Sequence, residues 1–182
     1  MKFKILRFKR LRSTNDTAIR IIQNSSLKYG MIIAENQSHG RGQYGKKWLC
    51  FKGNLFVSFF YSLENLNLTL SQITKLNCLL VKKIISKYYK KKITYKKPND
   101  LLIKGKKISG ILQEIIHKNN KKSLIVGIGL NLVKNPKIRN YPTANLNDLI
   151  NKKVSKKKIE IELKNIFEKN LSKFLDIGVG KS

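Results

Sequence analysis

The chain has 182 residues, enough for one sizeable hydrophobic core, and its composition gives no sign of a second full-sized domain. Hydrophobic residues make up 41% of it and aromatic residues 9%, which excludes a disordered chain. The formal net charge of +29 comes from 33 lysines and 6 arginines against 10 acidic residues. The chain also has 18 asparagines and 23 isoleucines. Lysine, asparagine and isoleucine share adenine- and thymine-rich codons, so a bias in nucleotide composition would produce the same totals. Because arginine is the residue usually used to read phosphates and bases, this lysine excess is weak support for a dedicated nucleic-acid-binding protein.

No targeting segment is visible in the sequence. The start, MKFKILRFKRLR, interrupts every apolar pair with a cation, and no later run approaches the ~18 apolar residues of a membrane helix. The two cysteines, Cys50 and Cys78, lack metal-ligand spacing and fit a reducing compartment. We therefore expect a cytoplasmic protein with no membrane partner.

The first 63 residues predict three strands and one helix. Residues 3–11 alternate apolar and basic positions and predict a strand, and STND at 13–16 offers capping side chains for a helix that follows. Apolar and β-branched residues at 31–36 and 54–63 predict two more strands. A glycine-rich, basic loop at 38–49 joins these two strands, and we expect it to be mobile until something binds.

The remainder predicts a long helix, further strands and a last helix. Thr69 and Gln72 form a capping-box pair ahead of a helical apolar pattern. Residues 100–116 predict two strands hinged near 104–106, and residues 123–133 predict another. Ser155 is expected to cap a final helix. Its apolar face is predicted to carry Ile159, Leu163, Ile166, Phe167 and Phe174.

The residues able to do chemistry point to an anionic ligand. The two histidines, His39 and His117, belong to no recognisable Ser/His/Asp or Cys/His set. Of the ten acidic residues, only Glu35, Asp100 and Glu114 lie near glycine-rich segments, so a two-carboxylate hydrolase or an all-protein metal cage is improbable. Cations, backbone amides and one or two carboxylates remain, and such a set suits a polyanion.

The loop GRGQYGKKW does not match the common phosphate motifs. A phosphate-binding P-loop needs Ser or Thr after its lysine, where this chain has Lys47. Gly40, Gly42 and Gly45 satisfy the spacing of the dinucleotide fingerprint, but the loop runs toward a strand and not into a helix. The loop must therefore be interpreted together with other segments.

Four segments in this order resemble the catalytic domain of biotin protein ligases. They are RSTND at 12–16, ENQSHGRGQYGKKW at 35–48, KKPNDLLIKGKKISGIL at 96–112 and GIGLNL at 127–132. The resemblance covers residues 9–133, with a weaker echo in NLNDLI at 145–150. It implies an α+β fold, a mixed β-sheet backed by helices, like that of class II aminoacyl-tRNA synthetases and biotin protein ligases.

The resemblance also implies site residues. A biotin pocket is expected from Ser13, Thr14, Asn15, Gln37, Gly40, Arg41, Gly42, Gln43, Lys107 and Gly110. An ATP site is expected from Lys46, Trp48, Asn99, Asp100 and Asn131. Arg41 and Lys107 would be the catalytic residues, and Asp100 would hold the metal ion, magnesium.

The implied activity is that of an ATP-dependent ligase with Mg²⁺ as cofactor and biotin as substrate. Biotin would be activated as biotinyl-5'-AMP and transferred to a lysine of the biotin carboxyl carrier protein of acetyl-CoA carboxylase. Residues 1–182 are expected to form a single catalytic domain, with no N-terminal helix-turn-helix, no specific DNA binding, and the family's small C-terminal β domain absent or truncated. A homodimer is left open.

The chain departs from the family pattern at three positions. Gln43 and Lys46 stand where the loop usually has arginine, and Lys97 stands where KWPND has tryptophan. Lys46 keeps the charge without the planar fork, and Gln43 keeps neither. Two alternatives stay open: a lipoate or octanoate ligase or transferase of the same fold, and a non-enzymatic nucleic-acid-binding protein.

Overall fold

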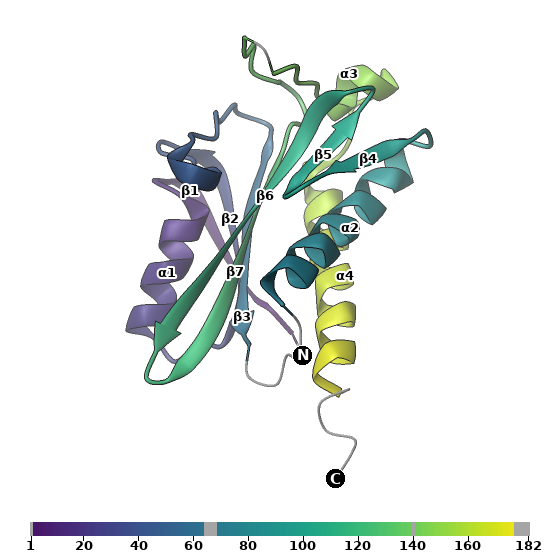
Figure 1. Ribbon diagram of the computed structural model, residues 1–182. Coiled ribbons are helices and arrows are strands. Elements are labelled where there is room, and N and C mark those ends of the chain that lie inside the picture. The colour runs from purple at the N-terminus through teal and green to yellow at the C-terminus, as the bar shows by residue number, and fades with distance from the viewer. Residues whose placement is uncertain (1, 64–68, 140, 177–182) are drawn as a thin grey trace.

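A single mixed β-sheet lies at the centre of the computed structural model, which describes residues 2–63, 69–139 and 141–176, with the backbone alone for 172–176 (Figure 1). Its seven strands have the order β1-β2-β3-β7-β6-β5-β4. The strands are β1 (Lys4–Leu11), β2 (Tyr29–Gln37), β3 (Leu55–Ser62), β4 (Ile93–Lys96), β5 (Asp100–Ile103), β6 (Lys106–Lys118) and β7 (Lys121–Leu130). The helices are α1 (Thr14–Asn24), α2 (Leu70–Tyr88), α3 (Leu146–Ile150) and α4 (Lys156–Asp176), with a short 3-10 turn at Gln43–Gly45.

Strand pairing brings distant parts of the chain together. β1 and β2 are parallel and are joined through α1, whereas every other neighbouring pair is antiparallel. β3 pairs with β7 from Leu55↔Leu130 to Ser62↔Ser123, which joins the first third of the chain to its later part. The expected α+β architecture with a mixed sheet backed by helices is confirmed.

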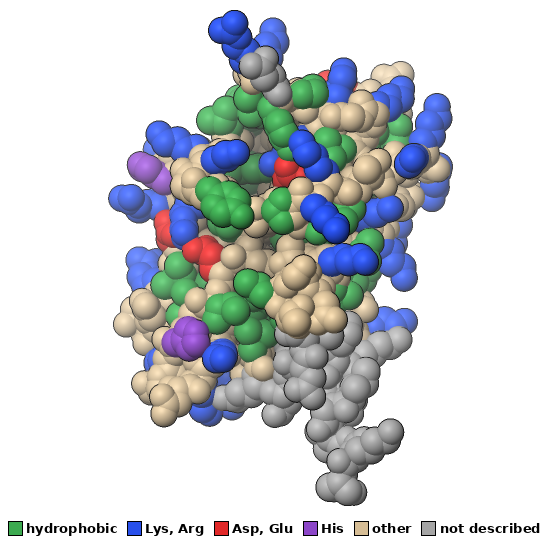
Figure 2. Space-filling view, in the orientation of Figure 1, with side chains coloured by type: hydrophobic (Ala, Val, Ile, Leu, Met, Phe, Trp, Pro, Cys, Tyr) green, Lys and Arg blue, Asp and Glu red, His purple; other side chains and the backbone are tan. Residues whose placement is uncertain are grey.

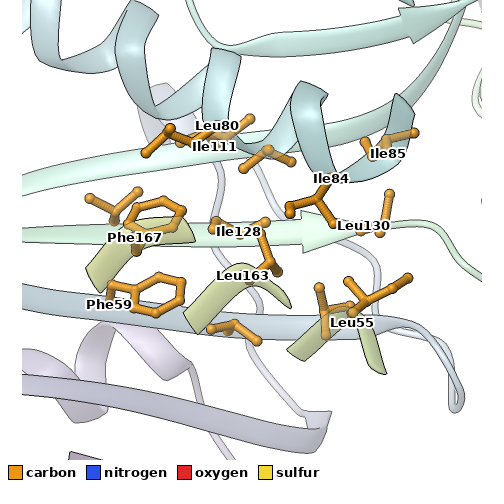
Figure 3. Close-up of a cluster of buried hydrophobic side chains, with 14 of the residues drawn as sticks. Leu55, Phe59, Leu80, Ile84, Ile85, Ile111, Ile128, Leu130, Leu163 and Phe167 are labelled. Carbon is orange, nitrogen blue, oxygen red and sulfur yellow. The ribbon is translucent and has the colours of Figure 1, made fainter. Parts of the chain in front are cut away.

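Helices cover both faces of the sheet. α1 lies on one face, and α2 and α4 lie on the other (Figure 1). The larger core forms on the α2 and α4 side, where Phe59 of β3 stacks on Phe167 of α4 with ring centroids 4.2 Å apart (Figure 3). On the α1 side, Ala18 and Ile22 pack against Phe60 in a smaller cluster. The two cores hold the strands that line the site.

Side chains fix the helix ends where the sequence predicts them. The Ser13 hydroxyl accepts the N–H of Asp16 at the start of α1, and Thr69 and Gln72 form the predicted capping box of α2. Ser155 caps α4. The side chain of Phe174, predicted for the apolar face of α4, lies outside the described residues. Within the described ranges, no helix is both long and apolar enough to span a membrane.

The end of β7 and the short helix α3 differ from the sequence prediction. β7 ends at Leu130 and not at 133, because the Asn54 amide draws the following residues out of the sheet. Its Oδ1 accepts the backbone N–H groups of Leu132, Val133 and Lys134 at 2.9–3.1 Å. The short helix α3 begins at an Asn145 cap that sequence reasoning did not single out.

Candidate active site

A cavity of about 530 Å³ opens where the glycine-rich loop meets the ends of β5, β6 and β7. Its wall also includes the 96–99 turn and Tyr141 from the segment before α3. Lysine and arginine side chains are spread over this face of the molecule (Figure 2). The cavity therefore combines residues from several segments that are far apart in the sequence.

The glycine-rich loop folds into a hairpin beside the cavity. The N–H of Trp48 donates to the carbonyl of Gly40 at 2.9 Å, and the N–H of Gly42 donates to that of Lys46 at 2.6 Å. At the tip, Tyr44 has a φ of 54° and Gly45 a φ of 72°, and the Tyr44 side chain is 90% exposed. These backbone hydrogen bonds fix the path of the loop between Gly40 and Trp48 in this conformation.

Trp48 lies against two glycines at the floor of the cavity. A Cβ on Gly129 would come within 2.4 Å of the indole, and one on Gly110 within 2.8 Å, so only glycine leaves room for the ring. The indole Nε1 is buried and has no hydrogen-bond partner in the part of the chain that the structure describes. Trp48 therefore forms a wall of the cavity and offers a donor to a ligand.

Lys107 and Asp100 form an ion pair at the cavity wall. The Lys107 Nζ lies 2.8 Å from Asp100 Oδ1, with side-chain exposures of 20% and 13%. The Tyr141 hydroxyl donates to the other carboxylate oxygen of Asp100. Burial, together with the hydrogen bond and the charge of Asp100, raises the pKa of Tyr141. Lys107 Nζ also lies 5.3 Å from the Trp48 ring centroid, within cation–π range.

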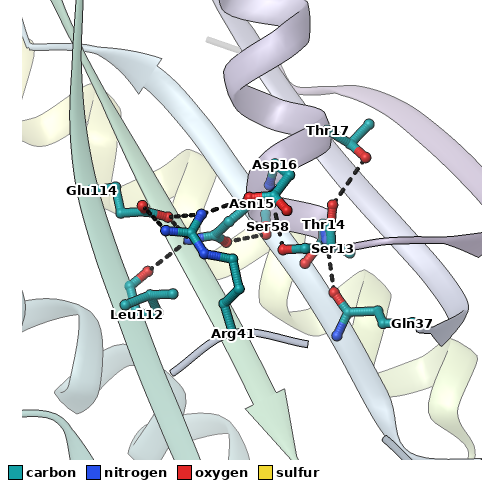
Figure 4. Close-up of polar contacts among 10 residues, drawn as sticks. All are labelled: Ser13, Thr14, Asn15, Asp16, Thr17, Gln37, Arg41, Ser58, Leu112 and Glu114. Atoms are coloured by element: carbon teal, nitrogen blue, oxygen red, sulfur yellow. Dashed lines mark hydrogen bonds and ion pairs between the residues drawn. The ribbon is translucent and has the colours of Figure 1, made fainter. Parts of the chain in front are cut away.

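Arg41 is held on the other side by two carboxylates (Figure 4). Its Nη1 donates to Asp16 Oδ1 at 2.6 Å, and its Nη2 donates to Glu114 Oε1 at 2.6 Å. Glu114 Oε2 in turn accepts from Asn15 Nδ2 at 2.7 Å, and Asn15 Oδ1 accepts from the Ser58 hydroxyl at 2.6 Å. This network connects the hairpin to α1, β3 and β6.

A second set of polar contacts lines the α1 end of the cavity. The N–H of Thr14 donates to Gln37 Oε1 at 2.7 Å, and Gln37 Nε2 donates to the Cys50 sulfur at 3.3 Å. Burial raises the pKa of the Cys50 thiol, so it stays protonated here. These contacts fix Gln37 and the start of α1 relative to each other.

The sequence model of the biotin/lipoate A/B protein ligase family matches residues 7–131. The chain belongs to this family. The match includes the hairpin, the Lys107–Asp100 pair and the Arg41 network.

Two bacterial relatives are similar to this chain over part of their length. The bifunctional ligase/repressor BirA of Bacillus subtilis is 31% identical over 128 residues, 69% of this chain and 39% of that protein. BirA of Escherichia coli is 32% identical over 102 residues, 55% of this chain and 32% of that protein. The chain thus spans about a third to two fifths of the length of these relatives.

The biotin protein ligase from Aquifex aeolicus, solved in complex with biotin and ATP, superposes with a TM-score of 0.79 at 27% identity. The alignment covers 95% of this chain and 72% of that one. A lipoate protein ligase from Thermoplasma acidophilum shares the fold at 13% identity and a TM-score of 0.64. The fold is therefore that of biotin protein ligase catalytic domains.

In this member of the family, the structure brings most of the expected site residues to one cavity. Those that line it are Ser13, Thr14, Asn15, Gln37, Arg41, Gly42, Gln43, Lys46, Trp48, Asn99, Asp100, Lys107 and Gly110. Gly40 and Asn131 do not line it. A Cβ on Gly40 would lie 2.4 Å from the Trp48 carbonyl, so Gly40 shapes the hairpin. Asn131 is 2% exposed, and its backbone joins Ile108 and Leu146.

Sequence reasoning missed Tyr141 and Ile138, which line the cavity from the segment before α3. The backbone of this segment docks on the site, because Lys107 N donates to Pro142 O at 2.8 Å and Ala144 N donates to Lys107 O at 3.0 Å. No motif or periodicity marks these residues, so only the folded chain reveals them.

The cavity offers few protein side chains that could bind a metal ion. It suits an ion that is held mainly by the phosphates of a bound ligand. Among the described residues no group of three or more His, Cys, Asp or Glu side chains is placed to hold a metal. Asp100 is the one carboxylate that lines the cavity in the described part of the chain. Mg²⁺ bound mainly by nucleotide phosphates and water needs only one or two carboxylates, so Asp100 fits that role.

Proposed function

We propose that this chain is an ATP-dependent ligase that activates biotin as biotinyl-5'-AMP. It would then transfer biotin to a lysine of a biotin carboxyl carrier protein, such as that of acetyl-CoA carboxylase. The observation that carries the proposal is the Lys107–Asp100 pair beside a basic glycine hairpin in one cavity. The biotin and ATP bound by the Aquifex aeolicus ligase, which shares this fold, support it.

The first step requires positive charge more than a nucleophile from the protein. A carboxylate oxygen of biotin attacks the α-phosphorus of ATP, an O–P bond forms, and pyrophosphate leaves with the electron pair of the broken bond. Two anions must meet, so a cation about 4 Å away is worth ~4 kcal/mol at an effective dielectric near 20, or about a thousandfold in rate. Lys107 is the semi-buried cation at the cavity wall, and the exposed Lys46 adds charge from the hairpin.

Mg²⁺ would neutralise the phosphate charge when bound with the nucleotide, and Asp100 would be its protein ligand. Asp100 also forms the ion pair with Lys107 and accepts a hydrogen bond from the Tyr141 hydroxyl. Asn99 keeps Asp100 at the wall, because its Nδ2 donates to the Ile111 carbonyl at 2.7 Å. We assign this end of the cavity, with Lys46 and Trp48, to ATP.

We assign the α1 end of the cavity to biotin, as the resemblance implies. Thr14 and Asn15 are 5% and 3% exposed there, and Gln37 accepts the backbone N–H of Thr14, whereas Gly110 lies nearer Trp48 and Lys107. The Asn15 amide is already bonded to Ser58 and Glu114, so it would act by holding this wall. The hairpin would shield the mixed anhydride from water until the amine of the acceptor lysine attacks its acyl carbon and AMP leaves.

The surface charge and the thiols fit this assignment. A net charge of +29 favours encounter with an acidic carrier domain. Cys50 and Cys78 are both free thiols, and we propose that the enzyme acts in the cytoplasm, where they would stay reduced.

The test is biotin transfer to a carboxylase carrier domain with ATP and Mg²⁺, followed by mass spectrometry of the carrier. The wild type should add one biotin, and Lys107→Ala should lose this activity. Lys106→Ala is the matched control, because its exposed side chain is the neighbour of Lys107 on β6 and does not line the cavity. Modification by lipoate or octanoate in place of biotin would move the assignment to the lipoate branch of the fold, and no acylation at all would refute the ligase.

A further inference from the structure

A second cavity lies on the α4 face of the sheet, whereas α1 lies on the other face (Figure 1). Its volume is about 730 Å³, and its wall comes from β1, β2, the 52–53 segment and the start of α4. Among the described residues it has none in common with the active-site cavity. Five basic residues line this α4-side cavity: Arg7, Lys9, Lys52, Lys156 and Lys157.

The alternation of side chains along β1 places two of these charges in the cavity. Phe3 belongs to the core that α2 and α4 cover. Arg7 and Lys9 stand an even number of positions after Phe3, so all three side chains point to the same face of the sheet. Arg7 confirms this orientation, because its Nη1 donates to Glu160 Oε2 of α4 at 2.7 Å. The apolar core on this face therefore ends beside a basic cavity.

A buried carboxylate orients Arg7. The side chain of Glu160 is 5% exposed, whereas that of Arg7 is 51% exposed. A guanidinium has five N–H donors. In the part of the chain that the structure describes, Glu160 is the one acceptor of a hydrogen bond from the Arg7 side chain. Most donors of Arg7 are therefore left for a ligand in the cavity.

Lys156 is partly buried in the same cavity with too little negative charge around it. Its Nζ donates to the carbonyl of Ala34 at 3.4 Å. Burial lowers the pKa of Lys156 below its ordinary value, although Glu160 and Glu35 act to raise it. Among the described residues, these are the two carboxylates that line the cavity. They do not offset the cost of burying Lys156, whereas a bound anion would.

The start of α4 adds positive charge where helices ordinarily avoid it. Its first three residues are lysines, and its first turn has no acidic residue. The first N–H groups of a helix already carry partial positive charge, so three lysines beside them are unfavourable. An anion in the cavity would reverse this repulsion.

The lining of the cavity favours a small phosphate ligand over a nucleic acid. Its five basic and two acidic residues leave an excess of three positive charges. Lysines bind phosphates as point charges. Single-stranded nucleic acids also need aromatic rings on which bases stack. The one aromatic residue in the described lining, Phe8, packs against the α1-side cluster instead.

We propose that the α4-side cavity is a second anion site, which binds a diphosphate group separately from the active-site cavity. Inorganic pyrophosphate and a nucleoside diphosphate both carry this group. The inference goes beyond the proposed function and does not depend on it, because the residues that line the α4-side cavity take no part in ligation.

The test compares two double variants that lose the same number of positive charges. Lys9→Gln/Lys157→Gln removes two exposed lysines that line the cavity. Arg10→Gln/Lys158→Gln is the matched control, because each residue is the exposed neighbour on the same element and does not line the cavity. Every protein in the comparison also carries Lys107→Ala, which weakens phosphate binding in the active-site cavity.

The measurement is isothermal titration calorimetry with inorganic pyrophosphate in the absence of Mg²⁺. Each lysine lost from the cavity should weaken binding about threefold, as for a partly exposed ion pair, so Lys9→Gln/Lys157→Gln should raise the Kd about tenfold. The control should raise the Kd less than about twofold, because solvent and salt screen charges outside the cavity. ADP is titrated in parallel. Tighter binding of ADP would identify a nucleotide as the source of the diphosphate group, and tighter binding of pyrophosphate would identify the free anion.

An equal rise of the Kd in both double variants would overturn the proposal, since it would show attraction by overall charge alone. A Kd above about 10 mM before the lysines are removed would do so as well. Tighter binding of a single-stranded oligonucleotide or of polyglutamate, lost in the same variant, would assign the surface to a macromolecule instead.

Two further arrangements keep the test decisive. If circular dichroism shows that Lys9→Gln/Lys157→Gln does not fold, Lys52→Gln takes its place, because Lys52 is exposed and lines the cavity from the segment before β3. It should raise the Kd about threefold, and an unchanged Kd would overturn the proposal. Ligation is not measured, so a chain that ligates no biotin would refute the proposed function and leave this result standing.

Discussion

Replacing Gly129 by alanine should push the Trp48 indole off the sheet. The added Cβ would lie 2.4 Å from the ring, whereas ordinary contact begins near 3.4 Å, so the ring or the strand must move by about 1 Å. Overpacking of this kind costs about 1–3 kcal/mol in the free energy of unfolding. At this chain length, about 2 kcal/mol lowers the thermal midpoint by about 6 °C.

Urea unfolding followed by circular dichroism measures this loss, and Trp48 emission should shift to the red at the same time. The double variant Gly129→Ala/Trp48→Ala supplies the control. Without the indole the alanine should be neutral, or stabilising by about 0.5–1 kcal/mol, because glycine within a strand is itself unfavourable. An equal loss with and without Trp48 would refute the explanation, since it would place the cost in the backbone of β7.

Three further predictions concern the frame around the site. Asn54→Ala leaves the N–H groups of Leu132 to Lys134 without their acceptor and should cost about 3 kcal/mol or more in urea unfolding, whereas a loss under 1 kcal/mol would show that water replaces the amide. Phe167→Ala should cost about 3–5 kcal/mol by removing the ring stacked on Phe59, and a neutral result would mean that α4 does not hold the core. Burial raises the pKa of Cys78 to about 12 from 9.0, so its contribution to stability is complete below pH 9 and is lost as pH rises toward 12. Between pH 8 and pH 10.5, the free energy of unfolding should therefore fall less in Cys78→Ala than in the wild type. An equal fall in both proteins would contradict this prediction.

Local signals sufficed for most of the fold. The Thr69–Gln72 capping box and the apolar spacing behind it predict α2, and β-branched and aromatic runs predict β3 and β7. The periodicity of apolar residues does not predict where a strand ends when a side chain from a distant part of the sequence determines that end. Asn54, just before the neighbouring strand β3, sets the end of β7, and nothing near residue 130 in the sequence shows this.

The site was accessible through its motifs, and its internal contacts were not. The motifs predict that Arg41 and Lys107 line one cavity, which they do. The partners of these two residues come together only in the folded chain. Glu114, which binds Arg41, lies 73 positions away from it in the sequence. Tyr141, which binds the Asp100 partner of Lys107, lies 41 positions from Asp100. Sequence reasoning noted Asp100 and Glu114 as scarce acids near glycines, and it could not assign each to its cation.

The order in which the chain emerges and folds has a bearing on when this site exists. β3 meets β7 through residues such as Leu55 and Leu130, which are 75 positions apart, and closing so long a loop is slow compared with forming α2 or the β6–β7 hairpin. The floor beneath Trp48 belongs to β6 and β7, and its hairpin belongs to the segment before β3. A growing chain would therefore gain ligand affinity abruptly, after β7 has docked, and ligand present at that moment would trap the completed sheet.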